Sequence, residues 1–223
     1  MSETALNITG LTYRSLGDRA ADYIRDLIIR HQLAPGTRLP EETFASSLGV
    51  SRACVREAFM RLESEGLLRR VRNRYTEVAV FTQKDVKEIL ALRCAIEVLS
   101  AKTCIENGRI PVEELRKQVD VIAARSEDAK PDTMAIMESD LDFHEIIIRA
   151  SGNSRVLDVW NRLKSQMKVL LFTALINKSN VMKLRGADVH RPIIDAFIER
   201  DQDKVAVLIE EHISRSSMVS IEG

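Results

Sequence analysis

The chain of 223 residues lacks a long apolar run, an excess of charge and a start typical of exported proteins. No apolar run approaches the roughly 20 residues that span a bilayer. The first ten residues lack the basic start and the apolar stretch of a secretory signal. These absences exclude a membrane-spanning helix and a membrane partner, and they favour the cytoplasm. The formal net charge is zero, so overall charge gives no sign of a nucleic-acid partner.

Cysteine is scarce, because only Cys54, Cys94 and Cys104 are present and no two of them form a Cys-x-x-Cys pair. An odd and widely spaced set excludes a disulfide framework and favours free thiols in a reducing compartment. Internal repeats and low-complexity segments are also missing. The remaining composition, 45% hydrophobic and 30% charged residues, is that of an ordinary globular protein, and the length allows two modest cores.

Lysine is absent from the first 80 residues, which contain 12 arginines and 10 acidic residues. The balance is therefore +2 there and −2 in the rest of the chain. Arginine suits bidentate contacts to bases and phosphates, although an imbalance of two charges is equally consistent with no nucleic-acid role.

The same 80 residues predict three short helices and then a β-hairpin. An Asp18 N-cap starts the first helix, Gly49 ends the second, and Ser51 caps the third, which Gly66 ends. β-Character then appears on either side of a polar turn over residues 72–75. The predicted segments are a helix with the stripe Ile24, Leu27, Ile28 and His31, a helix over 41–48, a helix between Ser51 and Gly66, and strands over 67–71 and 77–81.

From residue 83 onward the strand signals vanish and helical periodicity continues to the end. Short loops between sequential helices favour antiparallel neighbours in a bundle. The predicted fold is therefore mostly α, with a winged helix-turn-helix over residues 1–80 and an antiparallel all-α bundle over residues 81–223. Its six predicted helices cover 83–107, 111–126, 131–150, 154–177, 182–200 and 202–219.

Two helices joined by a tight turn, the second headed by basic residues, fit the major groove of DNA. Arg52 and Arg56 stand one turn apart, on the face opposite the apolar stripe that contains Phe59, so their guanidiniums would reach base edges and phosphates. A basic hairpin beside such a helix favours a wing for backbone or minor-groove contact. A solvated basic surface is the alternative. The hairpin arginines are Arg69, Arg70, Arg72 and Arg74.

An ordered set of motifs over about 35 residues resembles the GntR family of bacterial regulators. The resemblance implies a winged helix-turn-helix in which Arg38, Arg52 and Arg56 contact DNA. Ser51 and the wing residues Arg72 and Arg74 complete the predicted DNA-binding set. The matching motifs are Pro35-Gly36-Thr37-Arg38-Leu39-Pro40-Glu41, Leu48-Gly49-Val50-Ser51-Arg52, Val55-Arg56-Glu57-Ala58 and Leu62-Glu63-Ser64-Glu65-Gly66-Leu67.

Two residues depart from the family pattern. Cys54 stands where the family commonly has proline, which removes only a pre-set helical φ. Tyr75 stands where the family usually has the glycine of the wing tip. Because tyrosine tolerates a positive φ poorly, we expect another shape for this tip.

Three of the four histidines point inward in the second domain, together with one aspartate. Asp140 and His144 are four residues apart on a buried face, and His190 and His212 lie on the apolar stripes of two later helices. One inward histidine is more often a hydrogen-bonded core residue. Three inward histidines together with an inward carboxylate favour a divalent metal, which would offset the free-energy cost of burying the aspartate. The ligand set suits Zn²⁺, and Ni²⁺, Mn²⁺ and Fe²⁺ stay open.

Arg93 also lies beside an apolar stripe and needs a partner. The partner is either Glu97, one turn on, or the carboxylate of a bound ligand. An intra-helix ion pair at the edge of the bundle is the alternative without a ligand.

The layout of residues 85–215 resembles the FCD effector domain of the FadR subfamily, nearer its six-helix VanR-like branch. The resemblance implies that Asp140, His144, His190 and His212 hold the metal. It also implies that the metal and Arg93, with Glu97 beside it, receive a small carboxylate effector. The matching features are Leu92-Arg93 with Glu97, Asp140 with Phe143-His144, Ser151-Gly152-Asn153, His190 and His212.

The preferred hypothesis is a homodimer that binds palindromic operator DNA and responds to an organic or sugar acid. Release of DNA on ligand binding, hence repression, is favoured, while activation stays open. A metal-responsive regulator is one alternative. A metallohydrolase fused to a DNA-binding module is another, but Glu145, the nearest general base to His144, points a different way round its helix.

Overall fold

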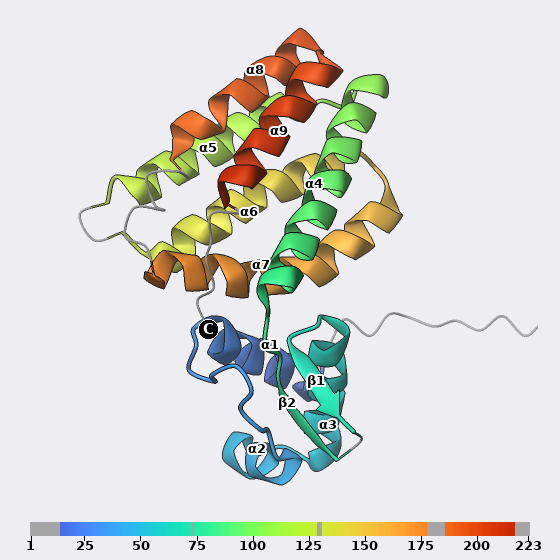
Figure 1. The fold of residues 1–223 in the computed structure, drawn as a ribbon, viewed down its shortest axis with the longest axis vertical. Coiled ribbons are helices and arrows are strands. Elements are labelled where there is room, and N and C mark those ends of the chain that lie inside the picture. The colour runs from blue at the N-terminus through green and yellow to red at the C-terminus, as the bar shows by residue number, and fades with distance from the viewer. Residues whose placement is uncertain (1–13, 73, 129–130, 178–185, 217–223) are drawn as a thin grey trace, which may run out of the picture.

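The computed structural model describes residues 14–72, 74–128, 131–177 and 186–216. Within them the chain forms a small DNA-binding-type domain and a larger helical domain (Figure 1). The first domain contains helices α1 (Leu16–Ile29), α2 (Glu41–Leu48) and α3 (Arg52–Ser64), followed by strands β1 (Leu68–Val71) and β2 (Tyr75–Val78). The predicted helix-turn-helix and its wing are therefore confirmed.

The ends of these elements follow their local chemistry. Ser15, and not Asp18, caps α1: the Ser15 hydroxyl accepts from the amide of Asp18, and the Asp18 carboxylate accepts from the amide of Ser15. Asp18 thus closes a capping box one turn further in. The helix ends at Ile29, so His31 lies outside it, with a φ of 55°. The expected α2 and its Gly49 stop are confirmed.

The hairpin is shorter than predicted and shifted toward its turn. The register pairs Leu68 with Val78 and Val71 with Tyr75, so Tyr75 belongs to β2 and not to the turn. The outer residues 79–81 are not in the strand. The left-handed backbone position falls on Arg72, with a φ of 46°, and not on Tyr75. Tyr75 therefore does not adopt the positive φ on which the expectation of another tip shape was based.

Six α-helices form the second domain within the described residues. They are α4 (Gln83–Glu106), α5 (Val112–Ser126), α6 (Thr133–Ala150), α7 (Ser154–Asn177), α8 (Arg191–Glu199) and α9 (Gln202–Ser216), with a short 3₁₀ turn η2 (Ala187–Val189) before α8. Their interior is filled by large side chains such as Trp160, Phe143 and Phe197. Among the described residues, no helix is both long and apolar enough to cross a membrane.

The predicted helix over 182–200 is wrong for residues 186–190, and residues 182–185 lie outside the described part of the chain. The helix α8 starts at Arg191 and has Pro192 in its first turn. Proline lacks the amide hydrogen that an interior position must donate and clashes with the preceding turn, so a helix can begin there but cannot run through it.

The two domains meet through α7. This helix lies across the lower end of the bundle, next to α1 (Figure 1). The Ser165 hydroxyl donates to Oε2 of Glu65 (2.8 Å), and the Gln166 amide donates to the backbone oxygen of Glu65 (2.8 Å). Glu65 is the C-cap of α3. The helical domain thus holds the end of the predicted recognition helix.

Candidate DNA-binding face and metal centre

The N-terminal turns of α3 carry the arginines predicted to read DNA. Ser51 caps the helix, because its hydroxyl accepts from the amide of Cys54 (3.2 Å). A proline at position 54 would have no amide hydrogen to give. The side chains of Arg52 and Arg56 are 61% and 59% exposed, while Phe59 on the opposite face is buried. Both guanidiniums are thus accessible.

Two acidic residues of α2 hold these arginines. Nη2 of Arg52 lies 2.9 Å from Oε2 of Glu42, and Nη2 of Arg56 lies 2.8 Å from Oε2 of Glu41. The hydrogen bond from Arg56 lowers the pKa of Glu41. Sequence reasoning missed both pairs, although two acidic residues that open the preceding helix were a visible signal.

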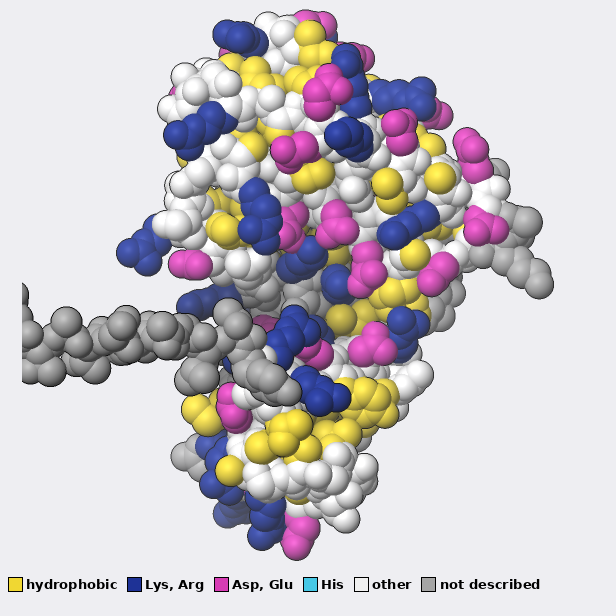
Figure 2. All heavy atoms as spheres, turned by 180° about the vertical axis from the view of Figure 1, so that it is seen from behind, with side chains coloured by type: hydrophobic (Ala, Val, Ile, Leu, Met, Phe, Trp, Pro, Cys, Tyr) yellow, Lys and Arg dark blue, Asp and Glu magenta, His cyan; other side chains and the backbone are white. Residues whose placement is uncertain are grey.

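The wing adds further positive charge beside α3. Arg72 and Arg74 flank the tip, and Lys and Arg side chains gather at the lower end of the molecule in Figure 2. The guanidinium of Arg38 lies over the ring of Tyr75, with Cζ 4.1 Å from the ring centroid. A groove runs between α2, α3 and the wing. It is lined by Arg38, Leu39, Pro40, Glu41, Glu42, Arg52, Arg56, Arg70, Arg74, Tyr75 and Thr76.

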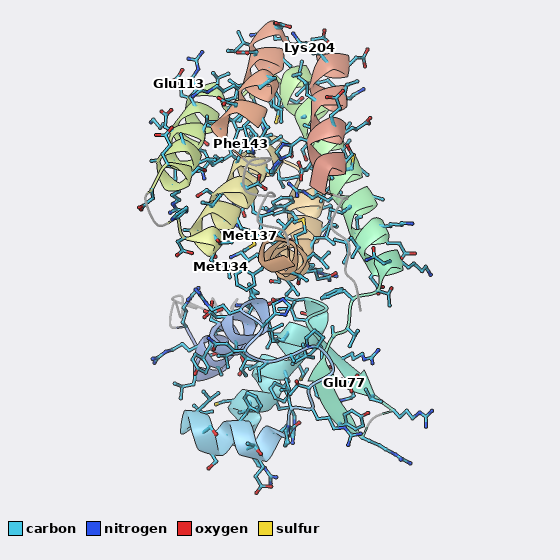
Figure 3. The ribbon with its side chains drawn as sticks, turned by 60° about the vertical axis from the view of Figure 1, so that its left-hand side comes forward. Glu77, Glu113, Met134, Met137, Phe143 and Lys204 are labelled. Carbon is cyan, nitrogen blue, oxygen red and sulfur yellow. The ribbon has the colours of Figure 1, made fainter. Side chains whose placement is uncertain are left out.

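Asp140, His144, His190 and His212 converge inside the helical domain. The first two lie four residues apart on α6, His190 is the N-cap of α8, and His212 lies on α9. All four are buried, and their candidate ligand atoms lie within 4.8 Å of one another. Phe143, inside the bundle in Figure 3, contacts the rings of His144 and His190.

The spacing of the donor atoms suits one divalent ion. Nε2 of His144 lies 3.0 Å from Nε2 of His212, and Oδ1 of Asp140 lies 3.3 Å from Nε2 of His190 and 3.6 Å from Nε2 of His212. Neighbouring ligand atoms with bonds of about 2.1 Å to a metal stand about 3.0–3.4 Å apart. The first two distances lie within this range and the third lies just above it, so the donor set fits a metal.

Burial favours the neutral form of His144 and His212, and contacts behind the rings orient His144 and His190. Burial lowers the pKa of His144, and it lowers the pKa of His212 to about 3. Neutral imidazole is the form that binds metals. Nδ1 of His144 lies 2.6 Å from Oε2 of Glu97, and Nδ1 of His190 lies 3.2 Å from the carbonyl oxygen of Gly186. Such partners on the far ring nitrogen are typical of metal-binding histidines.

Arg93 and Glu97 form an ion pair inside the bundle, with Nε of Arg93 2.6 Å from Oε1 of Glu97. Both side chains are fully buried, so the alternative of a pair at the bundle edge is wrong. Burial opposes ionisation of Glu97, but Arg93 and His144 outweigh it and lower the pKa of Glu97 to about 2. Nη1 and Nη2 of Arg93 have no hydrogen-bond partner within the described residues. Glu97 therefore satisfies one part of the guanidinium, and two nitrogens stay available for a ligand.

Comparison with known families matches both halves of the chain. A model of bacterial regulatory proteins of the gntR family matches residues 16–78, and a model of the FCD domain matches residues 88–215. Both matches agree with the two resemblances drawn from the sequence.

Similar proteins cover most of the chain. A probable D-xylose utilization operon transcriptional repressor from Paenarthrobacter nicotinovorans is 28% identical, over 92% of this chain and 88% of its own length. The gluconate operon transcriptional repressor of Bacillus subtilis (strain 168) is 31% identical, over 74% of this chain and 67% of its own. A solved structure of a putative GntR regulator from Rhodococcus sp. RHA1 has a TM-score of 0.74 at 21% identity, covering 92% and 97% of the two chains. This last likeness shows the fold.

Proposed function

The chain belongs to the GntR family of transcriptional regulators and carries an FCD domain, and we propose that it is a cytoplasmic, homodimeric repressor controlled by a small carboxylate effector. It is a regulator and not an enzyme, because the matching families and relatives are regulators. Repression is supported by the names of these two relatives.

In this proposal α3 enters the major groove of operator DNA. The exposed Arg52 and Arg56 would contact base edges and phosphates, with Ser51 at the head of the helix. Arg38 and the wing residues Arg72 and Arg74 would contact the backbone and the minor groove. Two copies would place two such helices on a palindromic site.

Asp140, His144, His190 and His212 would hold the divalent metal, with Zn²⁺ first and Ni²⁺, Mn²⁺ or Fe²⁺ as other candidates. When bound, the ion would supply positive charge that anchors an anionic ligand. Glu97 would hold His144 in the ligating orientation from behind, which is a more specific role than the effector contact expected from sequence.

The observation that carries the proposal is the buried guanidinium of Arg93 beside this cluster. With Asp140 and Glu97 ionised and the imidazoles neutral, the site has a net charge of −1. A divalent ion would bring it to +1, and a carboxylate would then neutralise it. A buried guanidinium with two unpartnered nitrogens is costly unless a ligand satisfies them. A small organic or sugar acid meets both requirements.

Control of DNA binding then requires that the acid bind two arrangements of the domains with different affinity. The contacts of α7 with Glu65 give the helical domain a direct hold on α3. The name of the gluconate operon repressor supports a sugar acid as the first effector to test.

The test replaces His144 and His190 by alanine together, with His31→Ala as the matched control outside the bundle. After dialysis against Zn²⁺, metal analysis should find one ion per chain in wild type and control, and none in the double variant. Gluconate and other small carboxylates should then raise the melting temperature of the loaded wild type but not of Arg93→Met. Full metal content in the double variant would end the metal assignment. If Zn²⁺ alone changes DNA affinity and no acid does, the ion itself is the signal.

A further inference from the structure

Arg38, Glu77 and Arg69 stand in one row across the wing. Residues 36–39 run beside β2: the Leu39 amide donates to the carbonyl of Thr76 (2.9 Å), and a bridge pairs Arg38 with Glu77. On the other side of β2, the register pairs Glu77 with Arg69 of β1. Paired residues point to the same face of a sheet, so the side chains of Arg38, Glu77 and Arg69 leave the sheet on one face.

Of the two arginines, only Arg69 forms an ion pair with the carboxylate of Glu77. Nε of Arg69 donates to its Oε1 at 2.6 Å, and the Glu77 side chain is 9% exposed. Glu77, labelled in Figure 3, lies in the wing. Arg38 turns instead to Tyr75, two residues along β2 on the same face, and covers its ring at 4.1 Å. Diagonal neighbours across antiparallel strands are within reach of aromatic and long side chains.

We propose that Tyr75 is a positioning residue that holds Arg38 for a DNA phosphate, and that Arg69 keeps Glu77 from capturing Arg38. This inference rests on the proposed DNA-binding face. Stacking on the ring engages only the flat face of the guanidinium, which leaves its N–H donors free at the edge. Those donors form the fork that matches a phosphate. Arg38 and Tyr75 both line the groove beside α3.

A double-mutant cycle on the full chain tests the positioning role. The probe is a duplex selected from a random library by the wild-type protein, with a random duplex of equal length for comparison. Tyr75→Leu should weaken binding about twofold to fivefold, the range of an exposed cation–π contact. Tyr75→Phe keeps the ring and should bind with the affinity of the wild type. Arg38→Ala should lower the slope of log K against log salt by about one.

In the Arg38→Ala background, Tyr75→Leu should cause no further loss. An equal loss there would mean that Tyr75 contacts DNA itself, and a loss in Tyr75→Phe as large as in Tyr75→Leu would assign the effect to the hydroxyl. Either result overturns the proposal. Unchanged melting temperatures are required of all variants, which keeps a folding defect apart from a binding defect.

A second cycle tests the competition for Glu77. Arg69→Gln should weaken binding more when Glu77 is present than in a Glu77→Gln background, because a released carboxylate captures Arg38. Equal losses in both backgrounds would overturn the role of Arg69. The parent proposal has its own indicator: Arg52→Ala and Arg56→Ala should abolish the preference for the selected duplex. If they do not, the DNA-binding face itself is wrong, whatever Tyr75 does.

Discussion

At the scale of single residues, the arginines predicted to contact DNA are already paired with acidic side chains in the free protein. Arg52 and Arg56 are paired with Glu42 and Glu41 on α2. Exposed ion pairs of this kind contribute little to stability, so phosphates and base edges can replace them. In the proposed complex the acidic residues would remain near the DNA and repel it. They would then reduce non-specific binding to any duplex and leave the sequence-dependent contacts to compensate.

Glu42→Gln should therefore tighten binding of a random duplex by up to about fivefold at low salt. The physical reason is the loss of a carboxylate 2.9 Å from Arg52, on the proposed DNA-binding face. Equilibrium titration with labelled duplex measures the change. Asp26→Asn is the matched control, since Asp26 of α1 also forms an exposed pair, with Arg30, and the substitution removes the same charge. An equal gain in both variants would reduce the effect to net charge alone.

Periodicity predicted which side chains face inward, but not which of them touch. The spacing placed Asp140, His144 and His212 on buried faces because an apolar stripe marks the buried side of a helix. It left the partner of Arg93 open between Glu97 and a ligand, and it did not predict the contact of Glu97 with His144, because that contact depends on how α4 packs on α6. The structure brings Glu97 against both Arg93 and His144. Contacts between helices depend on packing that no single segment encodes.

At the scale of elements, the ends of helices were predicted correctly where a glycine marks them. Gly49, Gly66 and Gly152 mark helix ends, and all three have a positive φ. The error before α8 came from extending an apolar stripe through Pro192. In the wing, the sequence placed Tyr75 in the turn, whereas the structure places Tyr75 in β2 and the left-handed backbone position on Arg72. Hairpin register decides that position, and local propensity does not reveal the register.

The turn after α3 is where the helical domain meets the DNA-binding domain. A Cβ at Gly66 would collide with the Gln166 amide of α7, and its φ of 74° disfavours any side chain. Gly49, at the end of α2, has a φ of 65° and nothing within 4 Å of a Cβ. A side chain at either position would therefore meet the same unfavourable backbone conformation, but only a side chain at Gly66 would also collide with α7.

Gly66→Ala should therefore lower the free energy of unfolding by more than Gly49→Ala, which should cost about 1–2 kcal/mol from the left-handed backbone alone. Adding Gln166→Ala to Gly66→Ala should remove most of the difference by clearing the collision. Urea unfolding measures all three variants. Equal losses for the two glycine variants would show that α7 does not press on this turn in solution.

At the scale of the whole molecule, two connections join the predicted effector site to the predicted recognition helix α3. One is covalent, through α4, which carries Arg93 and Glu97 and follows β2 directly. The other is the packing of α7, which is linked to α6 by the pairs of Lys164 with Asp142 and Glu145. Because α6 carries Asp140 and His144, a shift at the proposed metal site would reach α3 through α7 as well as through the chain.

His31 is the second place where α7 holds the DNA-binding domain. Its Nε2 lies 2.9 Å from the Thr173 hydroxyl, and its ring stacks on Phe172 at 5.9 Å. Burial between the domains lowers the pKa of His31 below its ordinary value of 6.5. The unfolded chain therefore binds this proton more tightly than the folded protein does. The free energy of unfolding keeps the full contribution above pH 6.5 and loses it as the pH falls below that value.

Replacing His31 by glutamine keeps a hydrogen-bonding group toward Thr173 but removes the titration. The melting temperature of the wild type should thus fall more steeply between pH 7.5 and 5.5 than that of His31→Gln. The three bundle histidines are present in both proteins, so the difference between the two curves isolates the contact between the domains. Parallel curves of melting temperature against pH would mean that His31 is as solvated in the folded protein as in the unfolded chain. In that case α7 does not pack against α1 in solution. A widening gap toward low pH would show that the contact between α7 and α1 is made in solution, where it can take part in control of α3.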